Sequence, residues 1–113
     1  MSNTLTLKKS RRPNKKYVVD TGTKKIHFGG VKEDGTPYRD FLLMNDKNSK
    51  YYEPNKLERE KVKARYRQRH KNDNLDNALS AGALSFYLLW NKVSLRKSIQ
   101  DYEKRFNIKI IIK

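Results

Sequence analysis

Positive charge limits what this chain can fold into more than any other feature of its sequence. Its 113 residues hold 27 Lys and Arg against 12 Asp and Glu, a formal net charge of +15. A chain of this length supports one hydrophobic core, and repulsion among so many cations opposes its compaction. The excess charge must therefore lie on the surface or be neutralised by a partner. Nucleic acid is the first candidate, ahead of anionic lipid and acidic protein.

The first concentration of charge is at the N-terminus. Residues 1–16 hold six basic residues and no acidic one, and Pro13 interrupts any helix there. This composition is typical of a segment that does not fold alone. We therefore predict a disordered basic arm over residues 1–15 and a single small domain over residues 16–113. The cations of this region expected to contact a polyanion are Lys8, Lys9, Arg11, Arg12, Lys15 and Lys16.

A β-hairpin is expected after the arm. Tyr17-Val18-Val19 and Lys25-Ile26-His27-Phe28 favour strands, and the polar residues between them include Gly22, as in a turn. Residues 38–44 form an apolar patch that predicts a short helical turn packed on the hairpin. Residues 45–55 have the polar composition of an exposed loop.

Three helices are expected beyond this loop. Asn55 and Ser94 are suitable N-caps for helices over residues 56–71 and 95–106. Residues 79–90 are apolar nearly all round, as in a helix at the centre of a core. The Ile-rich residues 108–112 could add a strand to the hairpin. The predicted fold class is α+β, with an N-terminal hairpin packed against two or three helices and a possible C-terminal strand.

The helix over residues 56–71 is the second concentration of charge, with eight basic residues and two acidic ones. Like charges four residues apart destabilise an isolated helix, so an anionic partner would relieve a local cost. Phosphate contact is one interpretation, and a solvated helix face in a Lys-rich chain is the other. The basic side chains concerned form two rows at helical spacing, Arg59, Lys63 and Arg67, and Lys61, Arg65 and Arg69.

Aromatic side chains lie near these charges in the sequence. Tyr51 and Tyr52 fall in the polar loop, where burial is least assured, and they are the candidates for stacking on unpaired bases. Core packing is the alternative, and it is favoured for the chain's other aromatic residues.

We find no pattern that predicts an enzyme, a cofactor or a metal site. His27 and His70 lack cysteine partners and metal-ligand spacing, and we interpret them as structural or surface residues. Asp40 and Asp101 are expected to pair with Arg69 or Arg105. The longest apolar run, residues 84–90, is far shorter than a membrane span, so no membrane partner is expected.

Five short motifs together resemble a family of short basic proteins, of unknown function, encoded by nucleocytoplasmic large DNA viruses. The resemblance covers roughly residues 11–106 and depends on the order of the motifs, since none is diagnostic alone. The loop over residues 45–55 is longer than is usual in that family. The motifs are Lys16-Tyr17, Ile26-His27-Phe28-Gly29, Tyr38-x-Asp40-Phe41, Arg65-Tyr66-x-x-Arg69-His70 and Leu89-Trp90-Asn91-Lys92-x-Ser94-Leu95-x-x-Ser98-Ile99.

The resemblance implies a viral protein, present in the virion and in the host cytoplasm or viral factory, and it transfers no catalytic residue. Together with the charge, it predicts a protein that binds nucleic acid, DNA rather than RNA, through phosphate contacts and largely independently of sequence. The alternative is a minor structural protein that bridges acidic virion or capsid proteins. In that case the arm and the Ile-rich tail would dock on neighbours by strand addition.

Overall fold

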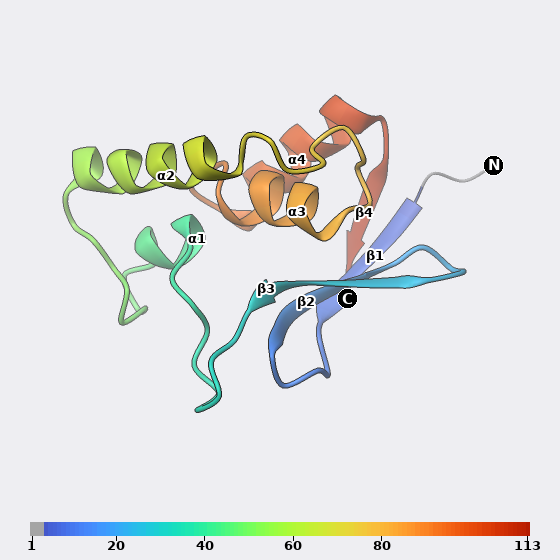
Figure 1. Cartoon of the computed structure of the whole chain (residues 1–113), viewed down its shortest axis with the longest axis horizontal. Helices are drawn as coiled ribbons and strands as arrows, with labels where there is room; N and C mark the ends of the chain where they lie inside the picture. The colour runs from blue at the N-terminus through green and yellow to red at the C-terminus, as the bar shows by residue number, and fades with distance from the viewer. Residues whose placement is uncertain (1–3) are drawn as a thin grey trace.

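A computed structural model describes residues 4–113, which form a four-stranded sheet with helices packed over one of its faces (Figure 1). This architecture confirms the α+β fold class. Along the chain, the elements are β1 (Thr4–Lys9), β2 (Lys15–Asp20), β3 (Lys25–Gly30), α1 (Phe41–Met44), α2 (Lys56–His70), α3 (Ala81–Leu84), the π-helical turn η1 (Ser85–Leu89), α4 (Leu95–Phe106) and β4 (Lys109–Ile112).

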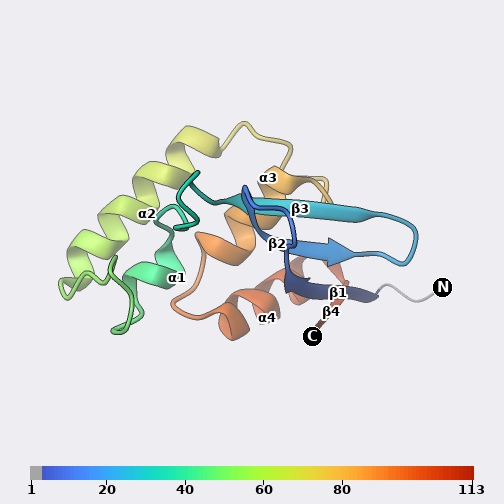
Figure 2. The same ribbon diagram turned by 90° about the horizontal axis from the view of Figure 1, so that it is seen from below.

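The expected hairpin forms the β2–β3 half of the sheet. The strand order is β3-β2-β1-β4, with β2 antiparallel to both of its neighbours (Figure 2). Tyr17 lies opposite Phe28, and the two rings contact each other at a centroid distance of 5.8 Å. Gly22 in the turn has a φ of +94°, a conformation that side chains other than glycine rarely adopt.

The predicted disordered arm is wrong for residues 4–15, and residues 1–3 lie outside the described part of the chain. Residues 4–9 form β1, an inner strand of the sheet between β2 and β4. The sequence Thr-Leu-Thr-Leu has the alternation of a half-buried strand, and Leu5 and Leu7 are both buried. Burial of each such side chain stabilises the fold by about 1.5–3 kcal/mol. This free energy offsets the conformational entropy lost when the basic segment becomes ordered.

The C-terminal strand pairs with β1 and not with the hairpin. β4 runs parallel to β1, with Leu5 beside Ile110. The main-chain N–H of Ile110 also donates a hydrogen bond to the carboxylate of Glu103 on α4, at 2.8 Å. The two ends of the described chain therefore lie in one half of the sheet, and β4 is an edge strand.

Local capping signals fix the ends of the two long helices as expected. The side chain of Asn55 accepts hydrogen bonds from the main chain at the start of α2, and Ser94 does the same for α4. Asn107 ends α4 in the left-handed conformation, with a φ of +55°. The apolar patch before the polar loop also contains the expected helical turn, α1.

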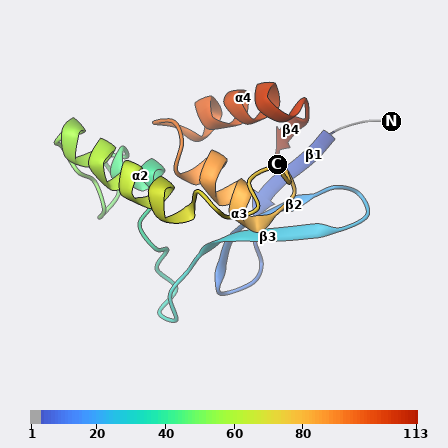
Figure 3. The same cartoon turned by 45° about the horizontal axis from the view of Figure 1, so that its top comes forward.

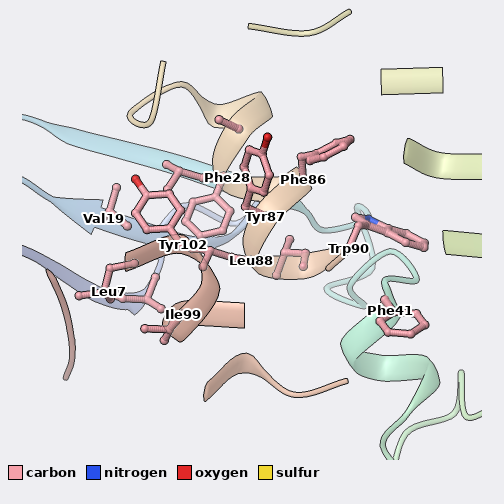
Figure 4. Close-up of a cluster of buried hydrophobic side chains, with 14 of the residues drawn as sticks. Leu7, Val19, Phe28, Phe41, Phe86, Tyr87, Leu88, Trp90, Ile99 and Tyr102 are labelled. Atoms are coloured by element: carbon pink, nitrogen blue, oxygen red, sulfur yellow. The ribbon is translucent and has the colours of Figure 1, made fainter. Parts of the chain in front are cut away.

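The central apolar helix is shorter than predicted and changes type along its length. It begins at Ala81, capped by Ser80, and from Ser85 it widens into η1, where the N–H of Trp90 donates to the carbonyl of Ser85. Its burial is as expected. Figure 4 shows side chains of this segment, among them Tyr87 and Leu88, in one cluster with Phe28 of the sheet and Tyr102 of α4.

Helix α2 lies beyond the end of the sheet, beside α1 (Figures 2 and 3). Val62 is the one buried side chain among its residues. Such a narrow apolar contact contributes little, so polar interactions must help to hold this helix against the domain.

Substitution of Leu7 tests whether the N-terminal residues are part of the core. Leu7→Ala should lower the free energy of unfolding by about 2–5 kcal/mol, because it leaves a cavity between the sheet and the helices. The exposed neighbour Lys9→Ala is the control, with a change expected within about 0.5 kcal/mol. Urea denaturation followed by the fluorescence of Trp90 measures both. Equal stability of the two variants would contradict the placement of β1.

Candidate functional site

The two rows of basic residues on α2 have different environments. We call Arg59, Lys63 and Arg67 the inner row, and Lys61, Arg65 and Arg69 the outer row. Every side chain of the inner row is half-buried and donates a hydrogen bond to a main-chain carbonyl. Every side chain of the outer row is exposed.

Arg67 illustrates the structural role of the inner row. Its Nη1 donates to the carbonyl oxygen of Trp90 at 2.8 Å and to that of Phe86 at 3.4 Å, and its guanidinium lies 3.9 Å from the Phe86 ring centroid. Phe86 lies in η1 and Trp90 is its C-cap, where main-chain oxygens lack partners within the helix and a cation is favoured. Desolvation lowers the pKa of Arg67, which is consistent with this half-buried position.

Lys63 and Arg59 bind the main chain in the same way. Nζ of Lys63 donates to the carbonyl of Asn91 at 3.0 Å and lies 4.5 Å from the centroid of the Phe41 ring. Arg59 donates to the carbonyl of Glu53 in the preceding loop. Because these groups are engaged within the protein, the outer row is the stronger candidate for contact with a partner.

Two members of the outer row, Arg65 and Arg69, line a cleft of about 390 Å³. It lies between α2, the segment that leads from β3 to α1, and the end of η1. Residues from all five motifs that carry the family resemblance meet in it. The lining residues are Lys16, Gly29, Gly30, Tyr38, Arg39, Asp40, Val62, Arg65, Tyr66, Arg69, His70, Ser85, Leu89 and Trp90.

A buried ion pair closes one part of the cleft. Nζ of Lys16 lies 2.7 Å from Oδ2 of Asp40, and the exposed fractions of the two side chains are 17% and 3%. The other oxygen of Asp40 accepts from the N–H of Leu43 and so caps α1. Asp40 was expected to pair with Arg69 or Arg105, and Lys16 takes that place because β2 lies directly beside the start of α1. The second expected pair forms, with Asp101 3.6 Å from Arg105.

This ion pair determines the net charge of the cleft. Within the described part of the chain, Asp40 is the one acidic residue that lines it, and Lys16 already neutralises that carboxylate. The exposed cations Arg39, Arg65 and Arg69 therefore remain without an acidic partner inside the cleft. The cleft can attract an anion. Lys16, in contrast, has its ammonium group committed to Asp40.

Three stacked rings form a wall of the cleft. The Tyr66 ring lies between Trp90 and His70, at centroid distances of 4.3 and 4.2 Å. Burial, followed by the charge of Asp73, raises the pKa of Tyr66 to about 12. These rings pack on one another, so they support the cleft and offer little free surface.

The structure offers a different tyrosine for base stacking than the two predicted ones. Tyr51 and Tyr52 are half-buried, and the hydroxyl of Tyr51 donates to the carbonyl of Pro37 at 2.8 Å. Tyr38, in the cleft, has a side chain that is 57% exposed. No sequence pattern singles it out, since its exposure depends on how the loop after β3 folds back on Gly30.

The N-terminal cations gather on and beside the hairpin. Lys8, Lys9, Arg11 and Arg12 are exposed, and Lys15 is half-buried. Three of them, Lys8, Lys9 and Arg11, line a hollow with Lys25, His27, Val18 and Asp20. We call this hollow the sheet hollow.

The pKa of His27 indicates the sign of the electrostatic potential in the sheet hollow. Its Nδ1 lies 2.7 Å from the hydroxyl oxygen of Ser10. Desolvation, followed by the charges of Arg12, Lys25 and Lys15, lowers the pKa of His27 below its ordinary value of 6.5. The local potential is therefore positive.

No protein-family model, curated protein or solved structure matches this chain. Within residues 4–113, no three His, Asp or Glu side chains gather where they could hold a metal ion. In the same residues, no helix has both the length and the apolar character needed to cross a bilayer.

The two rows of α2 should respond differently to the same substitution. Arg67→Gln removes a charged donor from the carbonyls of Phe86 and Trp90 and should lower the free energy of unfolding by about 1–3 kcal/mol. Arg69→Gln, two residues further on the exposed side, should change it by less than about 0.5 kcal/mol. Thermal and urea denaturation provide the comparison. A larger loss in the Arg69 variant would contradict the assignment of the rows.

Proposed function

We propose that this protein binds nucleic acid through phosphate contacts, largely independently of base sequence. The observation that carries the proposal is the cleft, in which three exposed arginines lie without a free acidic partner. Guanidinium groups match phosphate geometry and remain charged at every physiological pH. Repulsion between Arg65 and Arg69, four residues apart on α2, is a small cost that a bound phosphate would remove.

A basic hollow other than the sheet hollow adjoins the cleft, and this supports an extended polyanion as the partner. Lys16 lines the cleft and also a neighbouring hollow that contains Arg11, Arg12 and Pro37. Exposed cations thus lie on both sides of the paired Lys16, on the outer row of α2 and on the loop between β1 and β2, along a path through both hollows. A phosphate chain could follow this path, whereas a single small anion would need only one end of it.

The resemblance to proteins of large DNA viruses favours DNA as the partner and a location in the virion, the host cytoplasm or the viral factory. The phosphate contacts proposed here involve no base edge. The protein would therefore bind genomic DNA without reading its sequence.

A second candidate function is a minor structural role in the virion, bridging acidic virion or capsid proteins. The observation that favours it is the edge strand β4, where the side chains of Ile111 and Ile112 are 41% and 58% exposed. Such an edge can accept a strand from a neighbour. Location of the protein in purified particles separates the two functions, since the structural role requires the shell and the DNA-binding role requires the genome.

Salt dependence tests phosphate contact directly. Affinity for a duplex DNA should fall about 10³-fold or more between 50 and 200 mM salt if about six phosphates are neutralised. The double variant Arg65→Gln/Arg69→Gln should reduce the log–log slope by about 2, because two contacts are lost. Fluorescence anisotropy over a salt series measures both effects.

The matched control for this experiment removes the same charge from α4. Lys97→Gln/Lys104→Gln changes two exposed lysines outside the cleft and the sheet hollow, so its slope should stay close to that of the unmodified protein. Equal slopes for the two double variants would show that binding does not use the cleft. Absence of binding at 50 mM salt would refute the proposed function.

The imidazole of His27 provides a pH test of the sheet hollow. Nearby cations disfavour its protonated form, and bound phosphates would offset them, so saturation with duplex DNA should raise the pKa of His27. Proton uptake then accompanies binding, and affinity should increase as the pH falls through this pKa. NMR titration of the free and bound protein measures the shift. An unchanged pKa would place the DNA away from the sheet hollow.

A further inference from the structure

An exposed aromatic ring is held in a fixed position at the mouth of the basic cleft. The loop after β3 folds back so that the N–H of Tyr38 donates to the carbonyl of Gly30 at 3.1 Å, and Val31 pairs with Pro37. The Tyr38 ring then lies against the main chain of Gly30, where a Cβ atom would stand only 2.7 Å from the ring. Glycine at this position therefore permits the contact.

Tyr38 packs against the main chain of Gly30, and Nζ of Lys32 lies 5.6 Å from the centroid of its ring. More than half of the side chain faces solvent, although a tyrosine gains most when its ring is buried. The ring contacts Gly30 and still leaves a surface that a ligand can reach. An exposed ring that the folded loop already holds in place is a stacking surface. A ligand that binds it loses little conformational entropy in ordering the side chain.

Three arginines line the cleft together with this ring, and the ammonium group of Lys32 lies against the ring itself. Arg39 is the next residue in the chain, and Arg65 and Arg69 line the same cleft from α2. The volume of about 390 Å³ is within the range of pockets that hold small organic ligands. One aromatic platform flanked by guanidinium groups is the combination by which proteins hold single-stranded nucleic acid.

We propose that the cleft binds an unpaired nucleotide, with its base stacked on Tyr38 and its flanking phosphates on Arg65 and Arg69. The inference rests on the proposed function and makes it more specific. In a duplex, neighbouring base pairs cover both faces of every internal base, so Tyr38 has no surface to stack on. The cleft therefore favours single strands, while the sheet hollow contacts phosphates of either form.

Three variants and three probes test this proposal. Tyr38→Leu removes the aromatic face, and Tyr38→Phe keeps the ring as the matched control. Arg65→Gln/Arg69→Gln removes the phosphate contacts. The probes are a fluorescein-labelled oligothymidylate, an abasic oligomer of the same length and a duplex of that length, each titrated at 50 mM salt. The fluorescence of Trp90 and thermal unfolding establish that each variant is folded.

Tyr38→Leu should weaken binding of oligothymidylate about 5- to 100-fold, the range expected for one lost base stack. Its affinity for the abasic oligomer and for the duplex should change by less than about twofold, since neither places a free base on the ring. Tyr38→Phe should bind all three probes as the unmodified protein does. The arginine double variant should weaken all three.

The outcomes separate failure of this inference from failure of the proposed function. If Tyr38→Leu binds oligothymidylate as tightly as the unmodified protein does, the stacking site is refuted and phosphate binding stands. If the unmodified protein binds the abasic oligomer as tightly as oligothymidylate, the same conclusion follows without any variant. If it binds none of the three probes, or binds polyglutamate equally well, the proposed function itself is refuted.

Discussion

Hydrogen bonds from cationic side chains to main-chain carbonyls hold α2 on this protein, and the position of the cleft depends on them. Val62 is the one buried residue of the helix, and Tyr66 adds a stack on Trp90, so the apolar contact is narrow. Arg67 and Lys63 supply charged donors to the carbonyls at the end of η1, which would otherwise lack partners. In a domain with few apolar residues, part of the excess positive charge thus stabilises the packing of one helix on another. Loss of these contacts would release one wall of the cleft.

The same helix can serve structure and partner because its cations flank a narrow stripe. Val62 and Tyr66 lie four residues apart and face the domain, with the inner row along one side of the stripe and the outer row along the other. The inner row meets the end of η1, and the outer row meets the open cleft. Asp40 could have neutralised the outer row. Its buried pairing with Lys16 prevents this and leaves the arginines available.

The ends of the long helices can be predicted from nearby residues. Strand β1 cannot, because it depends on pairing between segments far apart in the sequence. Asn55 and Ser94 cap helices through neighbours two or three residues away, and such contacts can be inferred from the sequence. β1 requires partners from both β2 and the distant β4, and its two leucines looked isolated beside a run of cations. At the site, the cations of α2 were identified, but their division into two rows depends on where η1 ends. The sequence favours core packing for Tyr38 for a similar reason, since its exposure beside Gly30 depends on the tertiary fold.

The cleft is also the place where the five short motifs of the sequence meet. The resemblance to the viral family consists of an ordered set of short motifs, none of them diagnostic. Such a set is expected when separate segments contribute one or two residues each to a shared site, as Lys16, Asp40 and Trp90 do here. Those three are buried or paired and build the cleft. Tyr38 and Arg69 lie in the same motifs, yet they are exposed and add little to the core. Packing does not explain them, and the proposed recognition of a phosphate and a base would.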